Sequence, residues 1–118
     1  MSKKSLQLVS FEQAQRLKKA GFDWPVHARY DEEGALWRSG ICDHNTKGIF
    51  PSAPTVALAF KWARDAEGII NFVDCNIDHY WRGYLFYDGE LGQTALYKTY
   101  EAAERALMDA VLDELEKE

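Results

Sequence analysis

The fold is decided by one aromatic stretch, which reads His79-Tyr80-Trp81-Arg82-Gly83-Tyr84-Leu85-Phe86-Tyr87. It holds five of the sixteen Trp, Tyr and Phe residues in the 118-residue chain. Aromatic residues favour strands, so we predict a strand over residues 79–87. Successive side chains of a strand point to opposite faces. One face would carry Trp81 and Leu85 with His79, Gly83 and Tyr87, and the other Tyr80, Arg82, Tyr84 and Phe86.

The second of these faces is the candidate binding surface. We assign the Trp81 and Leu85 face to the helices, because an arginine such as Arg82 is rarely buried without a partner. Tyrosine and arginine are enriched at binding hot spots. The four candidate binding residues are therefore Tyr80, Arg82, Tyr84 and Phe86. The alternative is a strand buried on both faces, with Arg82 paired to an acid, and the sequence leaves both interpretations open.

Capping and turn signals around this strand define the other elements. Ser10 and Gln13 match a capping box and predict a helix over residues 11–20. Pro54 suits a first turn and predicts a helix over residues 52–67. Thr99 caps a last helix that runs to about residue 117. The other predicted segments are strands at 26–30, 35–39, 69–75 and 94–97, a loop at 40–52 and a turn at 88–92.

The resulting order, α-β-β-loop-α-β-β-β-α, indicates an α+β fold. We predict a two-layer sandwich in which a mainly antiparallel sheet is packed by three helices. A chain of 118 residues with 47% hydrophobic residues suits one packed domain. We therefore predict a single domain over residues 1–118, with residues 1–9 as a loose tail.

Charge and cysteine content limit the cellular compartments and the classes of partner that suit this chain. The formal net charge is −5, which argues against non-specific binding to a polyanion. The first residues lack the apolar run of a signal peptide, and no stretch approaches the roughly 20 apolar residues of a membrane span. The two cysteines, Cys42 and Cys75, could form one disulfide, but reduced thiols in the cytoplasm are the better interpretation.

The predicted order of the second half, α-β-β-β-α, resembles the double-stranded-RNA-binding domain. That domain meets phosphates with lysines at the start of its last helix. Here Lys98 is followed by Glu101 and Glu104, and residues 101–118 carry a net charge of −5. The resemblance covers the element order alone, so we do not expect nucleic-acid binding at this helix.

Cysteine and histidine residues supply the sharpest candidates for chemistry. Cys42, His44, Cys75 and His79 could form a tetrahedral zinc site, although their spacing matches no standard zinc finger or ribbon. Cys75 with His79, or Cys42 with His44 or His27, would provide a nucleophile and a base. No glycine-rich oxyanion or phosphate loop accompanies them. We therefore expect no bound metal, no cofactor and no catalytic residue.

Three capped segments, at residues 10–25, 53–69 and 97–112, carry a resemblance when they are taken together. They begin with Ser10-Phe11-Glu12-Gln13-Ala14, Ala53-Pro54-Thr55 and Tyr97-Lys98-Thr99-Tyr100. They are similar to segments of small proteins of gut bacteria, their prophages and their phages, to which no activity is assigned. The resemblance implies a phage or mobile-element context in the cytoplasm of the host.

Our first hypothesis is a non-enzymatic accessory protein that binds another protein, either a host or a phage factor. The aromatic stripe and the acidic last helix would be its surfaces. A second hypothesis is a nucleic-acid-linked role, through stacking of single strands on the stripe or through acidic mimicry of DNA. A third is a small-molecule enzyme with a deep pocket at Cys42, His44 or His79. An exposed sheet edge would also allow a homodimer.

Overall fold

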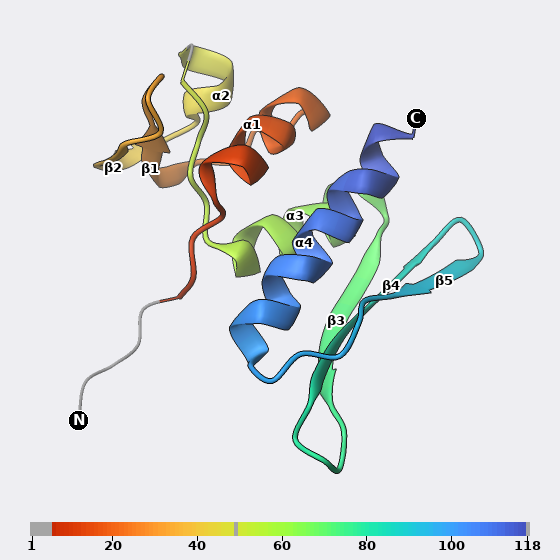
Figure 1. Cartoon of the computed structure of the whole chain (residues 1–118). Coiled ribbons are helices and arrows are strands. Elements are labelled where there is room, and N and C mark those ends of the chain that lie inside the picture. Colours follow the sequence, from red (N-terminus) through yellow and green to blue (C-terminus); the bar gives the residue numbers. More distant parts are fainter. Residues whose placement is uncertain (1–5, 49, 118) are drawn as a thin grey trace. The chain divides into compact units, whose positions relative to one another are not determined.

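The computed structural model of the protein describes residues 6–48 and 50–117 (Figure 1). These residues form four helices and five strands, and all strand pairs are antiparallel, which confirms the predicted α+β class. The strands form two sheets, of two and three strands, where we expected one. Contacts divide the chain into two compact units, Met1–Ala59 and Phe60–Glu118, which we call the first and second units.

The first unit begins with helix α1, Phe11–Ala20, as predicted. The capping box is present, because Ser10 Oγ accepts from the Gln13 N–H and Gln13 Oε1 accepts from the Ser10 N–H, both at 3.1 Å. Gly21 ends the helix with a φ of 97°, a left-handed conformation that glycine adopts without steric cost. Both ends of this helix are therefore fixed by local sequence signals.

Strands β1, Val26–Tyr30, and β2, Leu36–Cys42, form the hairpin of the first unit. The prediction of a loop over residues 40–52 was wrong, because β2 extends to Cys42 and a short helix, α2, follows at His44–Lys47. Asp43 caps α2 by accepting from the Thr46 N–H at 3.2 Å. Asn45 then donates to the Phe22 carbonyl and accepts from the Ser52 N–H, both at 2.8 Å. Side-chain bonds thus order this segment.

The segment before α1 pairs with the segment before helix α3, Val56–Glu67. The Val9 N–H donates to the Pro54 carbonyl at 3.0 Å, and the Val56 N–H to the Gln7 carbonyl at 2.7 Å. Pro54 therefore precedes α3 and does not occupy its first turn, which corrects the predicted start at residue 52. Of the predicted loose tail, Gln7–Val9 is held by these bonds, and residues 1–5 lie outside the described residues.

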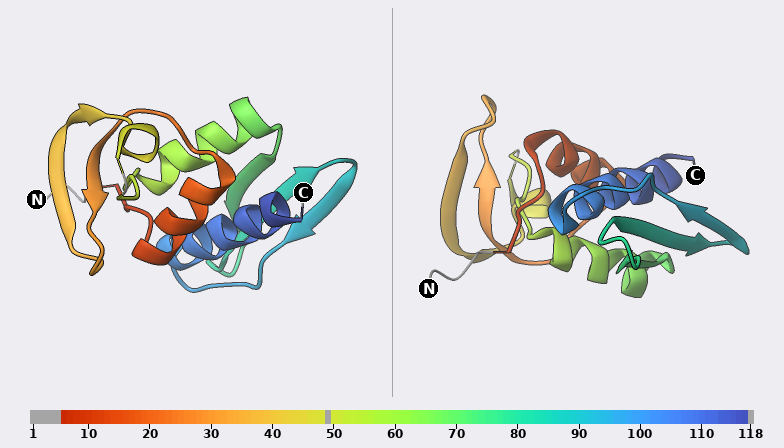
Figure 2. Two further views of the ribbon diagram at one scale, coloured as in Figure 1. Left: turned by 90° about the horizontal axis from the view of Figure 1, so that it is seen from above. Right: turned by 60° about the horizontal axis from the view of Figure 1, so that its bottom comes forward.

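The second unit contains the sheet β3-β4-β5 and helix α4. Its elements are β3, Ile70–Cys75, β4, Trp81–Tyr87, β5, Glu90–Gln93, and α4, Tyr100–Glu116. Helix α4 packs against β4 and β3, and Figures 1 and 2 show it on one face of the sheet. Its apolar stripe, with Leu107, Val111 and Leu112 all at 0% exposure, forms much of this core. This unit has the predicted two-layer arrangement.

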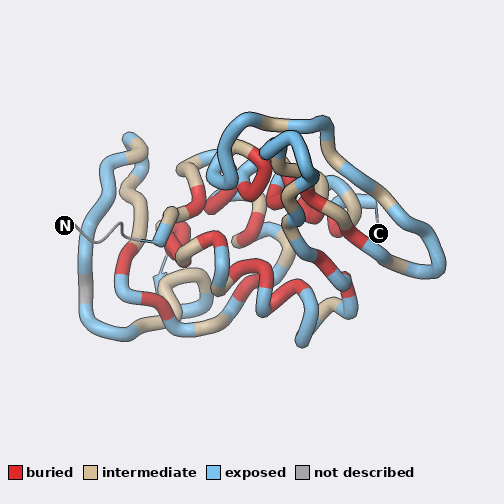
Figure 3. Tube along the Cα trace, turned by 90° about the horizontal axis from the view of Figure 1, so that it is seen from below, coloured by how far each residue is buried: buried red, intermediate tan, exposed pale blue. Residues whose placement is uncertain are grey.

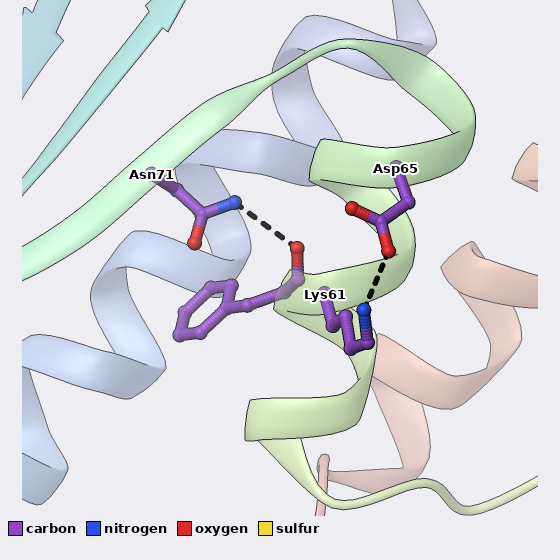
Figure 4. A network of polar contacts seen from close by, with 4 residues as sticks. Lys61, Asp65 and Asn71 are labelled. Carbon is purple, nitrogen blue, oxygen red and sulfur yellow. Dashed lines mark hydrogen bonds and ion pairs between the residues drawn. The ribbon is translucent and has the colours of Figure 1, made fainter.

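Side-chain and main-chain bonds also fix β3 against the end of α3. Asn71 is 5% exposed, and its Nδ2 donates to the Phe60 carbonyl at 3.2 Å (Figure 4). Arg64 donates to Asn71 Oδ1 at 2.9 Å. On the exposed side of α3, Lys61 and Asp65 form an ion pair at 2.7 Å. A buried amide with bonded donors and acceptor thus ties the strand to the helix before it.

Two strands in this unit differ from the predictions by two residues or more, both because of turn chemistry. Strand β4 starts at Trp81, since His79 has a φ of 64° and belongs to the turn before it. The third strand was predicted at residues 94–97 but lies at Glu90–Gln93. Asp88 and Gly89, with φ values of 54° and 82°, form a two-residue hairpin turn of the type that Asp-Gly favours. The predicted turn at 88–92 was therefore too long, and the exposed tip of the hairpin is visible in Figure 3.

Candidate binding face

Strand β4 presents its two sets of side chains as the alternation predicts. Leu85 is 5% exposed on the face toward α4. A Cβ atom added to Gly83 would lie 2.7 Å from Leu107 Cβ, so the backbone of β4 touches α4 directly. Arg82, Tyr84 and Phe86 alternate with these residues and therefore lie on the opposite side of the sheet.

The registers of β3 and β5 against β4 place further side chains on this side of the sheet, so the surface spans three strands. Directly opposed residues of antiparallel strands share a face. Phe86 lies between Ile70 of β3 and Leu91 of β5. Phe86 is 43% exposed, Ile70 is 54% exposed and Leu91 is 68% exposed. We call this surface the outer face, and it consists of Ile70, Phe72, Asp74, Arg82, Tyr84, Phe86, Leu91 and Gln93.

An aromatic pair lies at the middle of the outer face. Tyr84 of β4 is opposite Phe72 of β3, and their rings stack with centroids 5.0 Å apart and an interplanar angle of 19°. Phe72 is 51% exposed, and Tyr84 is half-buried. Stacking of this kind fixes both rings without removing them from solvent, which gives a rigid apolar contact area.

Arg82 lies at one end of the outer face, opposite Asp74. It is half-buried, and its Nε has no hydrogen-bond partner among the residues that the structure describes. The Asp74 carboxylate accepts from the Cys75 N–H at 2.8 Å. Arg82, Asp74, Tyr84 and Leu96 help to line a small pocket of about 120 Å³.

The structure brings three of the four predicted binding residues together and places the fourth beside them. Arg82, Tyr84 and Phe86 are on the outer face, whereas Tyr80 precedes β4 and is 38% exposed at the rim of the small pocket. Sequence reasoning missed Ile70, Phe72 and Leu91, which adjacent strands contribute. The alternation of Ile70 and Phe72 in a predicted strand was the available signal, but the strand register was needed to use it.

The cysteine and histidine candidates remain separate side chains in the structure. Both cysteines are free thiols, and Cys75 Sγ lies 3.5 Å from the Asn76 carbonyl oxygen. Within the described ranges, no group of three or more His, Cys, Asp or Glu side chains could hold a metal ion. Burial lowers the pKa of His44, the Arg29 charge lowers it further, and Asp43 opposes both effects. His79 is exposed in the turn before β4.

The acidic last helix is less uniformly exposed than its sequence indicates. Glu104, one of its acids, is 6% exposed. Partial burial raises the pKa of Tyr100 to about 12, and a hydrogen bond to Glu104 and the charges of Glu104 and Glu101 act in the same direction. The first turn of α4 is thus a local network of acids and a phenol.

The order α3-β3-β4-β5-α4 is the one predicted, and this helix start carries acids where RNA binding needs lysines.

The first unit has its own, larger pocket, of about 610 Å³. Its walls are mainly apolar, and the polar side chains at its edge include His27 and Arg38. Of the residues offered as a nucleophile or a base, the lining contains His27 but none of Cys42, His44, Cys75 and His79.

No helix in the described part of the chain combines the length and the apolar character that crossing a membrane would require. Comparison with known proteins found no matching family model, no matching curated protein and no matching solved structure.

Proposed function

We propose that this chain is a small, non-enzymatic accessory protein of the cytoplasm that acts by binding another protein through the outer face. The observation that supports it is the row Ile70, Phe86 and Leu91, three apolar side chains on adjacent strands that are all more than 40% exposed. Contiguous exposed apolar surface of this kind marks interaction sites. The phage or mobile-element context that the resemblance implies makes a host or phage factor the partner we propose.

The shape of the outer face favours a protein over a small molecule. Ligand pockets usually measure about 300–1,000 Å³. The pocket beside Arg82 holds about 120 Å³, room for a few water molecules or one inserted side chain. A sheet surface with a small recess at one end suits a complementary protein surface, with Arg82 available to an acceptor at the rim.

The charge of the outer face disfavours a nucleic acid. Arg82 is the one basic residue among the eight that define the face, and Asp74 lies opposite it. Binding to nucleic acid requires several phosphate contacts from Lys and Arg. Aromatic stacking with single strands would thus lack the cationic groove that normally accompanies it.

A matched pair of surface variants tests the proposal. Phe86→Ser removes an exposed ring from the outer face, and Ile77→Ser removes an apolar side chain that is 93% exposed in the turn between β3 and β4. Loss of a hot-spot side chain costs about 2 kcal/mol or more, which is roughly a 30-fold loss of affinity. The measurement is quantitative capture of proteins from a lysate of the producing cells by each immobilised variant.

The expected result is a protein retained by the wild type and by Ile77→Ser but lost from Phe86→Ser. Equal retention by both variants would show that the outer face is not the binding site. Far-UV circular dichroism of each variant controls for unfolding, which is expected to be absent because both side chains are exposed.

A further inference from the structure

The pocket of the first unit arises where the chain leaves strand β1. The Ala53 N–H donates to the Ala28 carbonyl at 2.9 Å, so the chain runs beside β1 up to this point. The next carbonyl, that of Pro54, instead accepts from the Val9 N–H at 3.0 Å. Residues of β1 and of the segment that leaves it line the pocket, which holds about 610 Å³.

The reachable surface of this pocket is mainly apolar. Its base is closed by side chains that are all 3% exposed or less, namely Val26, Ala28 and Ala53. Above this base, Leu8 and Leu58 are half-buried and Pro25 is exposed. Pockets that hold small molecules usually measure about 300–1,000 Å³ and are lined mainly by apolar groups. The pocket can therefore take the apolar part of a small molecule.

Arg38 gives the rim of the pocket a positive charge. It lies opposite Ala28 in the register of β1 and β2, so its side chain leaves the hairpin on the same face as that of Ala28. Arg38 is exposed, and no hydrogen bond or ion pair among the described residues engages it. The described residues that line the pocket include no Asp or Glu, although the whole chain has a net charge of −5. An anionic group at the rim therefore meets a cation that is available to bind it.

The donors near the pocket favour a carboxylate over a phosphate. Phosphate sites commonly use the main-chain N–H groups at a helix N-terminus. Two such groups at the start of α3 are already used, because the Val56 N–H donates to the Gln7 carbonyl at 2.7 Å and the Leu58 N–H to Thr55 Oγ1 at 3.1 Å. A carboxylate needs fewer donors, since one guanidinium can bind both of its oxygens.

We propose that this pocket binds a small molecule that carries one carboxylate on an apolar chain of medium length, for which octanoate is the model. The Arg38 guanidinium binds the carboxylate, and Leu8 and Leu58 contact the apolar chain. The pocket belongs to the first unit and the outer face to the second, so this inference does not depend on the proposed protein binding.

Titration of the isotope-labelled chain with octanoate, followed by two-dimensional amide NMR, tests the site. Saturable shifts are expected for amides of β1 and of residues 53–58. Each methylene that the pocket buries should tighten binding by up to about fourfold, so octanoate should bind more tightly than hexanoate, and hexanoate more tightly than butanoate. No saturable shift below the micelle concentration of octanoate, shifts centred on the second unit, or equal affinities along the series would overturn the proposal.

Octanol and octylamine test the charge of the ligand, because they carry the same apolar chain without the carboxylate. Octanol should bind more weakly than octanoate, and octylamine more weakly still, since its charge has the same sign as that of Arg38. An affinity for octylamine equal to or above that for octanoate would overturn the assigned class of ligand.

A matched pair of variants tests the role of Arg38. Arg38→Gln should weaken octanoate binding by roughly 10- to 100-fold, the usual effect of losing hydrogen bonds to a charged group, and leave octanol binding unchanged. Lys47→Gln removes the same charge from the first unit at an exposed residue outside the lining, and it should bind octanoate like the wild type. The amide spectra of the free variants control for folding. An unchanged affinity in Arg38→Gln, or an equal loss in both variants, would overturn the proposal and leave the outer-face experiment with Phe86→Ser unaffected.

Discussion

Gly83 is a residue at which the sheet and α4 approach each other closely. The Cβ atom of an alanine there would lie 2.7 Å from Leu107 Cβ and 3.1 Å from Leu107 Cγ. Leu107 Cβ is bonded to the helix backbone, so relief requires β4 and α4 to move apart. The absence of a side chain at Gly83 is therefore a condition for presenting Tyr84 and Phe86 on the outer face.

We predict that Gly83→Ala destabilises the protein by about 1–3 kcal/mol, the typical cost of overpacking a core. Gly92→Ala is the matched control, because its Cβ would meet Leu85 at an ordinary 3.4 Å. The midpoints of urea unfolding provide the measurement. Equal midpoints for the two variants would show that the contact between Gly83 and Leu107 is looser than described.

The raised pKa of Tyr100 predicts that the free energy of unfolding depends on pH in the alkaline range. Its pKa in the folded protein is about 12, raised from an ordinary 10.0 by partial burial and by Glu104. Because the folded state holds the proton more tightly, the stabilisation is fully present below about pH 10 and is lost as the pH rises toward 12. Tyr100→Phe should reduce the dependence of unfolding free energy on pH in this interval. Superimposable pH profiles for the two proteins would contradict this role of Tyr100.

The four predicted binding residues show how far single positions can be inferred from the sequence. Alternation and the preference of Arg82 for water correctly assigned the two faces of the aromatic strand. Phe72 and Ile70 were not predicted as site residues, because their place beside Tyr84 and Phe86 depends on register. Register follows from turns and long-range pairing, which alternation alone does not encode.

At the scale of elements, helix boundaries were predicted better than strand boundaries. The capping box at Ser10 and the Thr99 cap correctly located α1 and the start of α4, because a cap is encoded within four residues. The start of α3 was misplaced, since a long-range pair between Gln7 and Val56 holds the preceding residues extended. Strand β5 was misplaced because the two-residue turn at Asp88 and Gly89 was interpreted as five residues.

The Asp88-Gly89 turn sets the register that places Leu91 beside Phe86. Gly89 has a φ of 82°, and an alanine there pays about 1 kcal/mol or more for the left-handed conformation. We predict this loss of unfolding free energy for Gly89→Ala, with little change for Gly40→Ala, where an added Cβ has no atom within 4 Å and φ is not positive. Thermal unfolding of the two variants compares them, and a smaller effect at Gly89 than at Gly40 would refute the assigned turn.

At the scale of the whole molecule, part of the high aromatic content of the chain is gathered on one surface. The chain carries a net charge of −5 and 14% aromatic residues. The outer face contains Phe72, Tyr84 and Phe86 and lies entirely within the second unit. The α+β class was predictable, because it follows from element order, whereas the division into two sheets depends on which strands pair. The protein binding proposed above is therefore assigned to one sheet of one unit.

Site-specific photo-cross-linking tests that location most directly. A photoreactive phenylalanine analogue replaces Phe86 in one protein and Ile77 in another, and each is irradiated in a lysate of the producing cells. We predict a covalent adduct with a second protein chain from position 86, and none from position 77, where Ile77 is more exposed, at 93% against 43% for Phe86, but lies off the outer face. Adducts of equal yield from both positions, or none from position 86, would contradict binding at the outer face.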